Sequence, residues 1–335
     1  MILGILRAAG ICLAWLVLAG LTAWAAAALY IDLPIADAGL PAAIVYLATI
    51  AAALILVPGH RGKAMACAVG FIGVLAWWLT VAPSNERTWQ GDVAQTAWAE
   101  IDGDQVTIHN VRNFAYRSEF DYTPHWETRT YNLNDIRGAD LFITFWGSPW
   151  IAHPIVSFQF GDHGHVAFSV ETRKEVGEEY STLRGFFRQY ELIYTIADER
   201  DVIRLRTNYR TGEEVYLYRT TVSPEMARAV FLGYLETANE LHRSPAFYNA
   251  ITSNCTTNIR IHTKSVVAKA APWDWRLLLN GKMDEFAYQY GSLAGNLPFD
   301  RLKQQAHIND AARAADGSEE FSDLIRKGRA GFGPE

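Results

Sequence analysis

The sequence predicts an α+β domain that follows an apolar, membrane-anchoring N-terminal region. Long apolar runs dominate residues 1–82, whereas the rest of the chain mixes polar and apolar residues. In that second part, residues 153–160 and 165–171 alternate with the two-residue period of strands, and residues 224–243 repeat apolar positions with the period of a helix. Strands followed by helices in separate blocks indicate the α+β class.

The N-terminal region contains three apolar runs, each close to the roughly 20 residues that cross a bilayer as a helix. They cover residues 5–30, 38–57 and 64–82. A cleaved signal peptide is the alternative for the first run, because Arg7 precedes its core and alanines occupy positions 25–28. Two more apolar runs follow at once, so we expect residues 1–82 to be a membrane anchor with three transmembrane helices.

The short loops between these runs indicate the orientation of the chain. Residues 58–63 include Arg61 and Lys63, whereas residues 31–37 carry two aspartates and no basic residue. Basic loops remain in the cytoplasm. With three crossings, everything after residue 82 lies on the other side of a bacterial inner membrane, in the periplasm. The formal net charge of −6 argues against nucleic acid as a partner.

The exported part begins with a linker and a first strand at residues 83–114, and the Cys/His domain is expected at 115–335. Further strands are predicted from short apolar or alternating segments, and Gly161-Asp162-His163-Gly164 is a hairpin signal. Ser223 and Pro224 are typical of a helix start. The predicted strands are 105–114, 141–146, 153–160, 165–171, 191–197 and 215–219.

Cys255 is the candidate nucleophile. Cys12 and Cys67 lie in the apolar runs, so Cys255 is the one cysteine of the exported part. A lone thiol in an oxidising compartment calls for a chemical explanation, although a buried inert cysteine is the alternative. Ser253 or Asn254 is a plausible N-cap for the helix that follows. Cys255 would then lie in the first helical turn, where the helix dipole favours a thiolate.

A cysteine nucleophile needs an imidazole base and a third group that orients the ring. His153 opens one predicted strand and His165 opens the next, but the sequence leaves open whether they meet. A structural histidine beside Trp150 is the alternative for His153. Glu171 or Asn254 is the alternative for the third group.

Other kinds of site have weaker signals. The segment 162–165 offers metal ligands, but the chain contains no His-Glu-x-x-His or Cys-x-x-Cys pattern, so we expect no metal. Phosphate-binding and dinucleotide-binding glycine patterns are also missing, and no cofactor is expected. Arg173, with Arg184 and Arg188, is either part of a solvated face or a binding site for a lipid head group or carboxylate.

Several strings resemble the Lnb N-terminal periplasmic domain family over roughly residues 115–290. The strings are RTYNL at 129–133, GSP at 147–149 with His153, FSVETRKE at 168–175, FFRQYEL at 186–192 and NCTTN at 254–258. The resemblance implies a lipoprotein N-acyltransferase in which Cys255 and His153 are the essential residues. Many family members have fewer membrane spans or extra downstream domains, so shared chemistry is better supported than a shared substrate.

The order of these residues also resembles circularly permuted papain-like enzymes, among them lecithin:retinol acyltransferase and the permuted NlpC/P60 group. In those enzymes a polar residue follows the histidine by about a dozen positions, which implies His165, and an asparagine precedes the cysteine, as Asn254 does. The resemblance therefore implies a permuted papain-like (NlpC/P60-like) domain.

The function expected from these observations is a periplasmic thiol acyltransferase. It would move an acyl chain from a membrane phospholipid to an amine, such as a lipoprotein N-terminus, through a thioester on Cys255. His153 would be the base, His165 the orienting group, and Asn254, Glu171 and Arg173 supporting residues. The alternatives are a cysteine peptidase or amidase built on the same residues, and a non-catalytic membrane-tethered assembly module.

Overall fold

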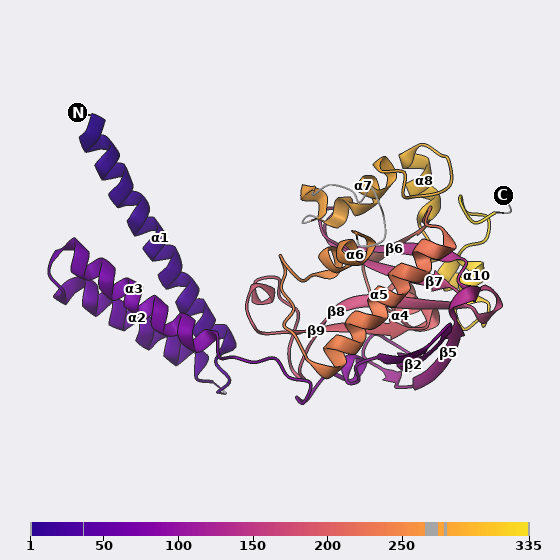
Figure 1. Cartoon of the computed structure of the whole chain (residues 1–335), viewed down its shortest axis with the longest axis horizontal. Helices are drawn as coiled ribbons and strands as arrows, with labels where there is room; N and C mark the ends of the chain where they lie inside the picture. The colour runs from indigo at the N-terminus through magenta and orange to yellow at the C-terminus, as the bar shows by residue number, and fades with distance from the viewer. Residues whose placement is uncertain (1, 36, 265–273, 278–279, 334–335) are drawn as a thin grey trace. The chain divides into compact units, whose positions relative to one another are not determined.

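The computed structural model describes residues 2–35, 37–264, 274–277 and 280–333 (Figure 1). The chain divides into two compact units. Unit 1 contains residues 1–84 together with the segment 180–190, and unit 2 contains residues 85–179 and 191–335. Unit 2 thus begins well before residue 115, and the residues expected as a linker contribute strands to it.

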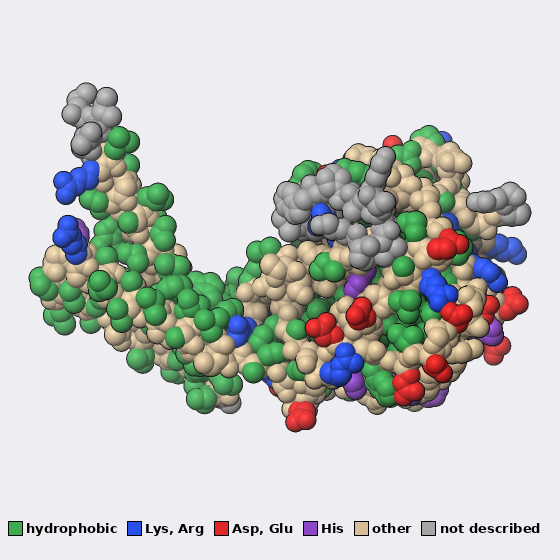
Figure 2. Space-filling view, in the orientation of Figure 1, with side chains coloured by type: hydrophobic (Ala, Val, Ile, Leu, Met, Phe, Trp, Pro, Cys, Tyr) green, Lys and Arg blue, Asp and Glu red, His purple; other side chains and the backbone are tan. Residues whose placement is uncertain are grey.

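Unit 1 contains the helices α1 (Ile2–Asp32), α2 (Gly39–Leu56) and α3 (Gly59–Trp78). Green hydrophobic side chains cover most of their visible surface (Figure 2). By length and composition, α1 and α2 are apolar enough to cross a membrane, and α3 is not. The expected number of three is therefore corrected to two candidate spans. The reason is that α3 begins at Gly59, and its first turns include Arg61 and Lys63.

Helix α3 nevertheless runs alongside α1 within unit 1. The ring of Trp15 lies 6.4 Å from that of His60 near the start of α3, and Trp24 lies 5.8 Å from Phe71. At the other end, the Trp78 indole Nε1 donates a 2.6 Å hydrogen bond to Asp32. These contacts show that α1 and α3 run in the same direction.

Unit 2 is built on one sheet with the strand order β1-β2-β9-β8-β7-β6-β10, and β5 also pairs with β2. Its neighbouring strands are antiparallel except β2 and β9. The strands are β1 (Trp98–Asp102), β2 (Gln105–Arg112), β5 (Trp126–Asn132), β6 (Gly138–Trp146), β7 (Ala152–Gln159), β8 (His165–Arg173), β9 (Glu191–Ala197) and β10 (Glu213–Arg219). A separate small sheet pairs β3 (Ala115–Tyr116) with β4 (Tyr122–Thr123).

Helices cover both faces of this sheet, as expected of a mixed α+β fold. On one face lies α5 (Pro224–Arg243), whose Phe231 and Tyr234 rings pack against Phe158 and Phe168 at centroid distances of 5.2–6.1 Å (Figure 1). Ile155 and Ala167 point to the other face because side chains alternate along a strand. There they join a core with α4 (Glu199–Arg204), α9 (Asn309–Ala314) and α10 (Phe321–Leu324).

The predicted elements around the site are confirmed by the structure. The helix over 224–243 and the strand over 191–197 have the expected bounds. Strands β7 and β8 form the expected antiparallel hairpin. The last helices are α6 (Cys255–Lys264), α7 (Met283–Gln289) and α8 (Phe299–Ala306). The circular permutation expected from the papain-like resemblance is not confirmed by this architecture.

Candidate active site

Cys255 is the first residue of α6, and the helix is capped by the residue before it. The Asn254 side-chain oxygen accepts a 2.9 Å hydrogen bond from the Thr257 backbone N–H, while the Thr257 hydroxyl accepts one of 2.9 Å from the Asn254 N–H. This reciprocal pair is a capping box. The predicted cap is therefore confirmed, and the N–H groups of the first turn have no intrahelical carbonyl partner. The Cys255 side chain is buried, with 6% of its surface exposed.

His153, near the start of β7, lies beside two polar residues of β8. Its ring Nε2 is 2.7 Å from the Ser169 hydroxyl and 3.1 Å from a Glu171 carboxylate oxygen. The Ser169 hydroxyl donates to the same carboxylate at 2.6 Å, so Nε2 is the donor toward Ser169. Because Nε2 contacts Ser169 and Glu171, the other ring nitrogen, Nδ1, is the one that can interact with the Cys255 thiol.

The environment of His153 favours its protonated form. Burial lowers the pKa of His153, but the Glu171 charge and hydrogen bonds with Cys255 and Glu171 outweigh burial and raise it to about 9. Burial works against the charged carboxylate as well, yet His153 and Arg206 hold the pKa of Glu171 well below its usual value. The site therefore stabilises an imidazolium and carboxylate pair next to the thiol.

Behind Glu171, Arg206 continues the polar chain. One guanidinium nitrogen lies 2.9 Å from the Glu171 carboxylate, and another lies 3.1 Å from Glu213. Arg206 belongs to the single-turn π-helix at Leu205–Tyr209, which follows α4 directly. Irregular turns of this kind recur at functional sites because they re-aim a side chain that a regular helix would direct elsewhere.

Asn280 connects the two halves of the site. Its amide Nδ2 donates to the Cys255 sulfur at 3.6 Å, and its Oδ1 accepts a 2.8 Å hydrogen bond from the Ala152 N–H, next to His153. Sequence reasoning missed Asn280, Ser169 and Arg206. The predicted hairpin of β7 and β8 could have indicated Ser169, because pairing the two strands brings it near His153. Asn280 and Arg206 belong to no local sequence pattern that would have indicated them.

The structure does not bring His165 to His153. In the β7–β8 hairpin His165 pairs with Gln159, and the same register carried to the other end places Glu171 opposite His153. His153 and His165 are thus separated by about 20 Å along the hairpin, at about 3.4 Å per residue. The expectation that His165 orients His153 is wrong, and Glu171, the alternative third group, lies in that position.

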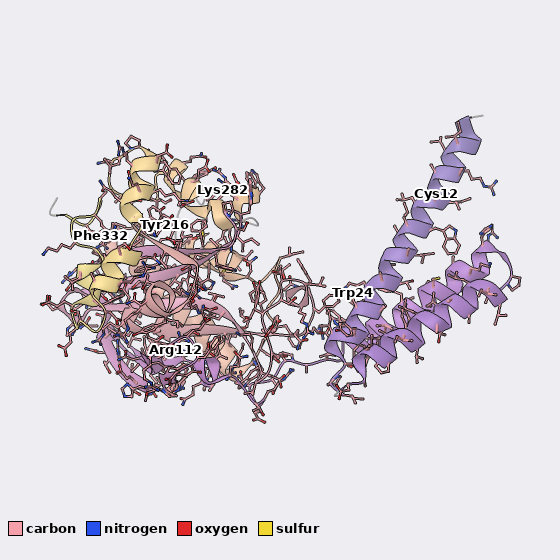
Figure 3. All side chains as sticks on the ribbon, turned by 180° about the vertical axis from the view of Figure 1, so that it is seen from behind. Cys12, Trp24, Arg112, Tyr216, Lys282 and Phe332 are labelled. Carbon is pink, nitrogen blue, oxygen red and sulfur yellow. The ribbon has the colours of Figure 1, made fainter. Side chains whose placement is uncertain are left out.

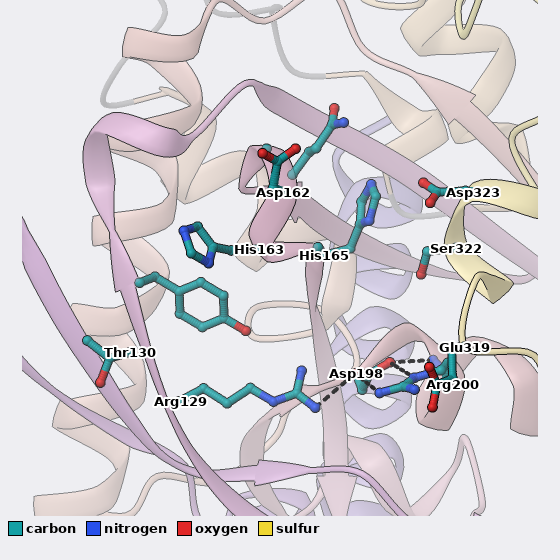
Figure 4. A pocket seen from close by; sticks show the side chains of 14 residues that line it. Arg129, Thr130, Asp162, His163, His165, Asp198, Arg200, Glu319, Ser322 and Asp323 are labelled. Carbon is teal, nitrogen blue, oxygen red and sulfur yellow. Dashed lines mark hydrogen bonds and ion pairs between the residues drawn. The ribbon is translucent and has the colours of Figure 1, made fainter.

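His165 instead lines a separate polar cavity of about 910 Å³ (Figure 4). Burial lowers its pKa, and within the described parts of the chain its Nε2 has no hydrogen-bond partner. Arg129 and Arg200 also line this cavity, and both are paired with Asp198. The described residues include no group of three or more His, Cys, Asp or Glu side chains placed to hold a metal ion.

Arg173, expected as a supporting residue of the site, instead makes contacts that hold the segment before β1. It is buried at the end of β8 and donates to the backbone oxygens of Val93 and Ala94, both at 2.9 Å, and to the side chain of Asn85. Its guanidinium lies 4.3 Å from the centroid of the Trp89 ring. Arg173 therefore fixes the segment before β1 and does not point into the site.

An apolar cavity of about 340 Å³ lies beside the helix that carries Cys255. Thr256, the next residue in the chain, lines it, together with Ile259 on the same helix. Tyr234 of α5 also lines it, with a buried hydroxyl that has no hydrogen-bond partner among the described residues. Burial raises the pKa of Tyr234 well above its usual value, and the nearby charges of Tyr194 and Cys255 add to this effect.

Residues 122–281 match the family model of the Lnb N-terminal periplasmic domain. The family that the sequence strings resemble is therefore confirmed for the region that contains His153, Glu171 and Cys255. With the apolar N-terminal helices, this match describes a membrane protein with a periplasmic domain. The comparison with curated proteins gave no match, and neither did the comparison with solved structures.

Proposed function

We propose, from the presence of a Lnb N-terminal periplasmic domain at residues 122–281, that the protein is a membrane-anchored thiol acyltransferase. The acyl donor is a phospholipid of the membrane that holds unit 1. The acceptor is an amine, such as the N-terminus of a lipoprotein. Cys255 is the nucleophile, His153 the acid and base, and Glu171 with Ser169 orients His153.

The first half-reaction transfers the acyl group to sulfur. His153 holds the proton of the Cys255 thiol as an imidazolium, and the thiolate attacks the carbonyl carbon of the ester. The ester C–O bond breaks, and the His153 imidazolium returns the proton to the departing alkoxide of the lysophospholipid. The N–H groups at the start of α6, and the Asn280 amide that lies 3.6 Å from the sulfur, are suited to stabilise the oxyanion.

The second half-reaction transfers the acyl group to nitrogen. The amine attacks the thioester carbonyl, His153 takes the proton from that nitrogen, and the C–S bond breaks. The products are an amide and the regenerated pair of Cys255 thiolate and His153 imidazolium. Glu171 supports both halves because it stabilises the imidazolium formed in each.

The apolar cavity is the observation that carries the acyl-transfer proposal over the peptidase alternative. A peptide cleft needs polar groups along its length to pair with the peptide backbone. The cavity beside α6 is instead lined mainly by apolar side chains, among them Val230, Met283 and Phe286. Its volume of about 340 Å³ is within the range of about 300–1,000 Å³ that is typical of small-molecule sites.

We also propose a permuted papain-like fold for this domain. The histidine lies on a strand, and the cysteine follows it in the chain at a helix N-terminus, an order that supports this fold.

The decisive experiment places the full-length protein in liposomes that contain phospholipid labelled in the acyl chain. We expect a label on Cys255 that hydroxylamine removes, and its discharge to an amide when a diacylated peptide with a free N-terminus is added. Cys255→Ala removes the adduct, while Cys67→Ser in α3 is the control that keeps it.

Each other outcome identifies an alternative. Discharge of the adduct by water in the presence of the amine supports a hydrolase. A folded protein that forms no adduct, and whose Cys255→Ala variant retains the function of the protein in cells, supports a non-catalytic assembly module and contradicts the proposal.

A further inference from the structure

The segment Tyr180–Tyr190 connects β8 to β9 in the sheet of unit 2, yet it is part of unit 1. The segment closes on itself, because the Tyr190 hydroxyl accepts a 3.0 Å hydrogen bond from the Ser181 N–H. The ring of Tyr180 also stacks on that of Tyr190, with centroids 6.2 Å apart. A compact loop with its ends close together is an Ω-loop, a type that is frequently functional.

Phe187 holds the loop against the membrane helices. Its side chain is buried in a cluster with Ala25 and Ala28 of α1 and Val74 of α3. Its ring stacks on Trp24, with centroids 6.2 Å apart and planes 24° from parallel. Trp24 is labelled on α1 in Figure 3, well along the helix from Cys12. The loop therefore packs at the C-terminal ends of α1 and α3.

Arg188 fixes the loop at the same level. Its backbone N–H donates to Asp32 at 3.2 Å, and its guanidinium donates to the Leu79 and Val81 carbonyls at 3.2 and 2.5 Å. The guanidinium also lies 4.2 Å from the centroid of the Trp78 ring. These helix ends are where a bilayer meets water, and tryptophan is typical of that depth.

Large apolar side chains of the same loop are exposed. Leu183 is 65% exposed, Tyr180 47% and Phe186 40%. All three precede the anchored Phe187 in the chain, Phe186 directly, so the loop presents them beside the apolar helices against which Phe187 packs. Apolar patches that are rimmed by polar residues mark interaction sites, and the continuity with the membrane helices selects a lipid surface as the occupant.

Arg184 adds a charged group to this surface. Of the three arginines considered for head-group binding, Arg173 is buried in unit 2 and Arg188 is bound to backbone carbonyls. Arg184 is half-exposed between Leu183 and Phe186, and its guanidinium forms no ion pair within the residues that the structure describes. A guanidinium binds phosphate oxygens in bidentate geometry.

We propose that the segment 180–190 is a membrane-dipping loop. Leu183 and Phe186 enter the boundary between the head groups and acyl chains of the outer leaflet, and Arg184 binds a lipid phosphate there. This inference concerns unit 1 alone and does not depend on the proposed acyl transfer.

The test measures the depth of residue 183 in a bilayer. The full-length chain, with its three cysteines replaced by alanine, receives a single Leu183→Cys substitution, carries an environment-sensitive fluorophore there, and is placed in phosphatidylglycerol nanodiscs. Lipids with a nitroxide near the carbonyl end of the acyl chain quench the fluorophore on contact. Leu16→Cys in α1, 70% exposed, is the lipid-facing control, and Asp310→Cys in unit 2, with 93% of its side chain exposed, is the solvent control.

We expect quenching at position 183 that is similar to that at 16 and several-fold stronger than at 310. Quenching at 183 no greater than at 310 would overturn the proposal, and protection of 183 by another protein in native membranes alone would assign the loop to a protein partner instead. Because Cys255 is replaced by alanine in this chain, the result is independent of the proposed catalysis.

Arg184 is tested in the same system. Arg184→Gln should reduce quenching at 183 in phosphatidylglycerol nanodiscs and have no effect in nanodiscs of an uncharged glycolipid without phosphate, whereas Arg313→Gln in unit 2 should change neither. Competition by free phosphate without nanodisc dependence would mean that Arg184 binds phosphate but not lipid. Equal quenching with and without Arg184 in every lipid would remove it from the proposal.

Discussion

At the scale of single residues, the site rests on one buried imidazole whose charge is set by its neighbours. His153 is 8% exposed, and an isolated imidazole at that depth would be neutral. Glu171 reverses this preference, and Arg206 in turn keeps Glu171 ionised. A proton is therefore available next to the sulfur at neutral pH, as the proposed acyl transfer through a thioester requires.

The first prediction concerns the pH dependence of this proton. Since the pKa of His153 is about 9, the rate should fall as pH rises through about 9 and the imidazolium is lost. Glu171→Gln removes an opposite charge, which typically shifts a pKa by about 1–3, so this alkaline limb should move to lower pH by that amount. The measurement is the pH profile of kcat/KM.

The control for this prediction is Glu213→Gln, which removes a carboxylate from the same polar chain on the far side of Arg206. Its alkaline limb should stay near that of the unmodified protein. The same proton also bears on stability. With a folded pKa above the ordinary 6.5, His153 stabilises the fold fully below pH 6.5, and this contribution is lost as pH rises through about 9. An unchanged limb in Glu171→Gln would show that Glu171 does not set the charge of His153.

A second prediction concerns Tyr234, whose buried hydroxyl lines the apolar cavity without a partner among the described residues. An unsatisfied buried hydroxyl costs about 1–3 kcal/mol, so Tyr234→Phe should raise the melting temperature. If the hydroxyl donates to the substrate carbonyl, the same change should lower kcat by up to about 100-fold. Thermal unfolding and the acyl-transfer assay measure the two effects.

Tyr194→Phe is the matched control, because the Tyr194 hydroxyl is 3.0 Å from His262 Nε2 and loses a hydrogen bond on substitution. It should lower the melting temperature and leave kcat nearly unchanged. A Tyr234→Phe variant that is less stable, with full activity, would show that the hydroxyl serves only packing.

At the scale of elements, the hairpin β7–β8 and the cap of α6 position the chemistry. The five-residue connection between Gln159 and His165 sets a register in which β8 brings Ser169 and Glu171 to the start of β7. The capping box fixes where α6 begins, and hence where the Cys255 side chain lies. Neither element depends on a special backbone conformation at the cysteine.

The third prediction concerns the turn that holds the loop before β7. Gly281 donates its N–H to the Trp150 carbonyl at 3.0 Å, and a Cβ at this position would lie 2.4 Å from the Trp150 carbonyl carbon. Because that neighbour is backbone, Gly281→Ala must displace the loop before His153. We expect destabilisation by about 1–3 kcal/mol and a loss of activity.

Thermal unfolding and activity should be compared with Gly333→Ala, where an added Cβ meets no atom within 4 Å. The control should behave as the unmodified protein. Full stability and activity of Gly281→Ala would mean that the loop at 149–151 tolerates displacement and does not help to place His153.

At the scale of the whole molecule, the chain passes between its two units three times, at residues 84, 179 and 190. The last two passages enclose the segment 180–190, so the sheet that carries the site is joined to unit 1 through β8 and β9 as well as through the linker at residue 84. A division by sequence position alone would assign this segment to the periplasmic domain.

The fourth prediction concerns the side of the membrane on which unit 2 lies. The basic loop at residues 58–63 predicts that residue 60 is cytoplasmic, and the family match predicts that residue 102 is periplasmic. In the cysteine-free chain, a membrane-impermeant maleimide should label Asp102→Cys in intact spheroplasts, and it should label His60→Cys only after permeabilisation. Both positions are exposed in the structure. Protection of residue 102 until permeabilisation would show a cytoplasmic domain, which would contradict the proposed orientation.

The sequence by itself determined the features that local patterns encode. Apolar runs predicted the anchoring helices, alternation predicted β7 and β8, and Asn254 beside Cys255 predicted the cap of α6. The family strings predicted the domain that the comparison then confirmed. The same local reasoning predicted α3 as a membrane span, because the apolar run at 64–82 does not include Arg61 and Lys63 in the first turns of the helix.

Only the tertiary structure decided which polar residues meet His153 and which segments join the anchor. Spacing along the chain suggested His165, but hydrogen-bond register decides which side chains face each other across a hairpin, and here it selects Glu171. Arg206 and Asn280 reach the site from elements distant in sequence, and Phe187 turns toward Trp24 in unit 1. These contacts depend on how elements pack, and packing is a property of the whole chain that no local pattern encodes.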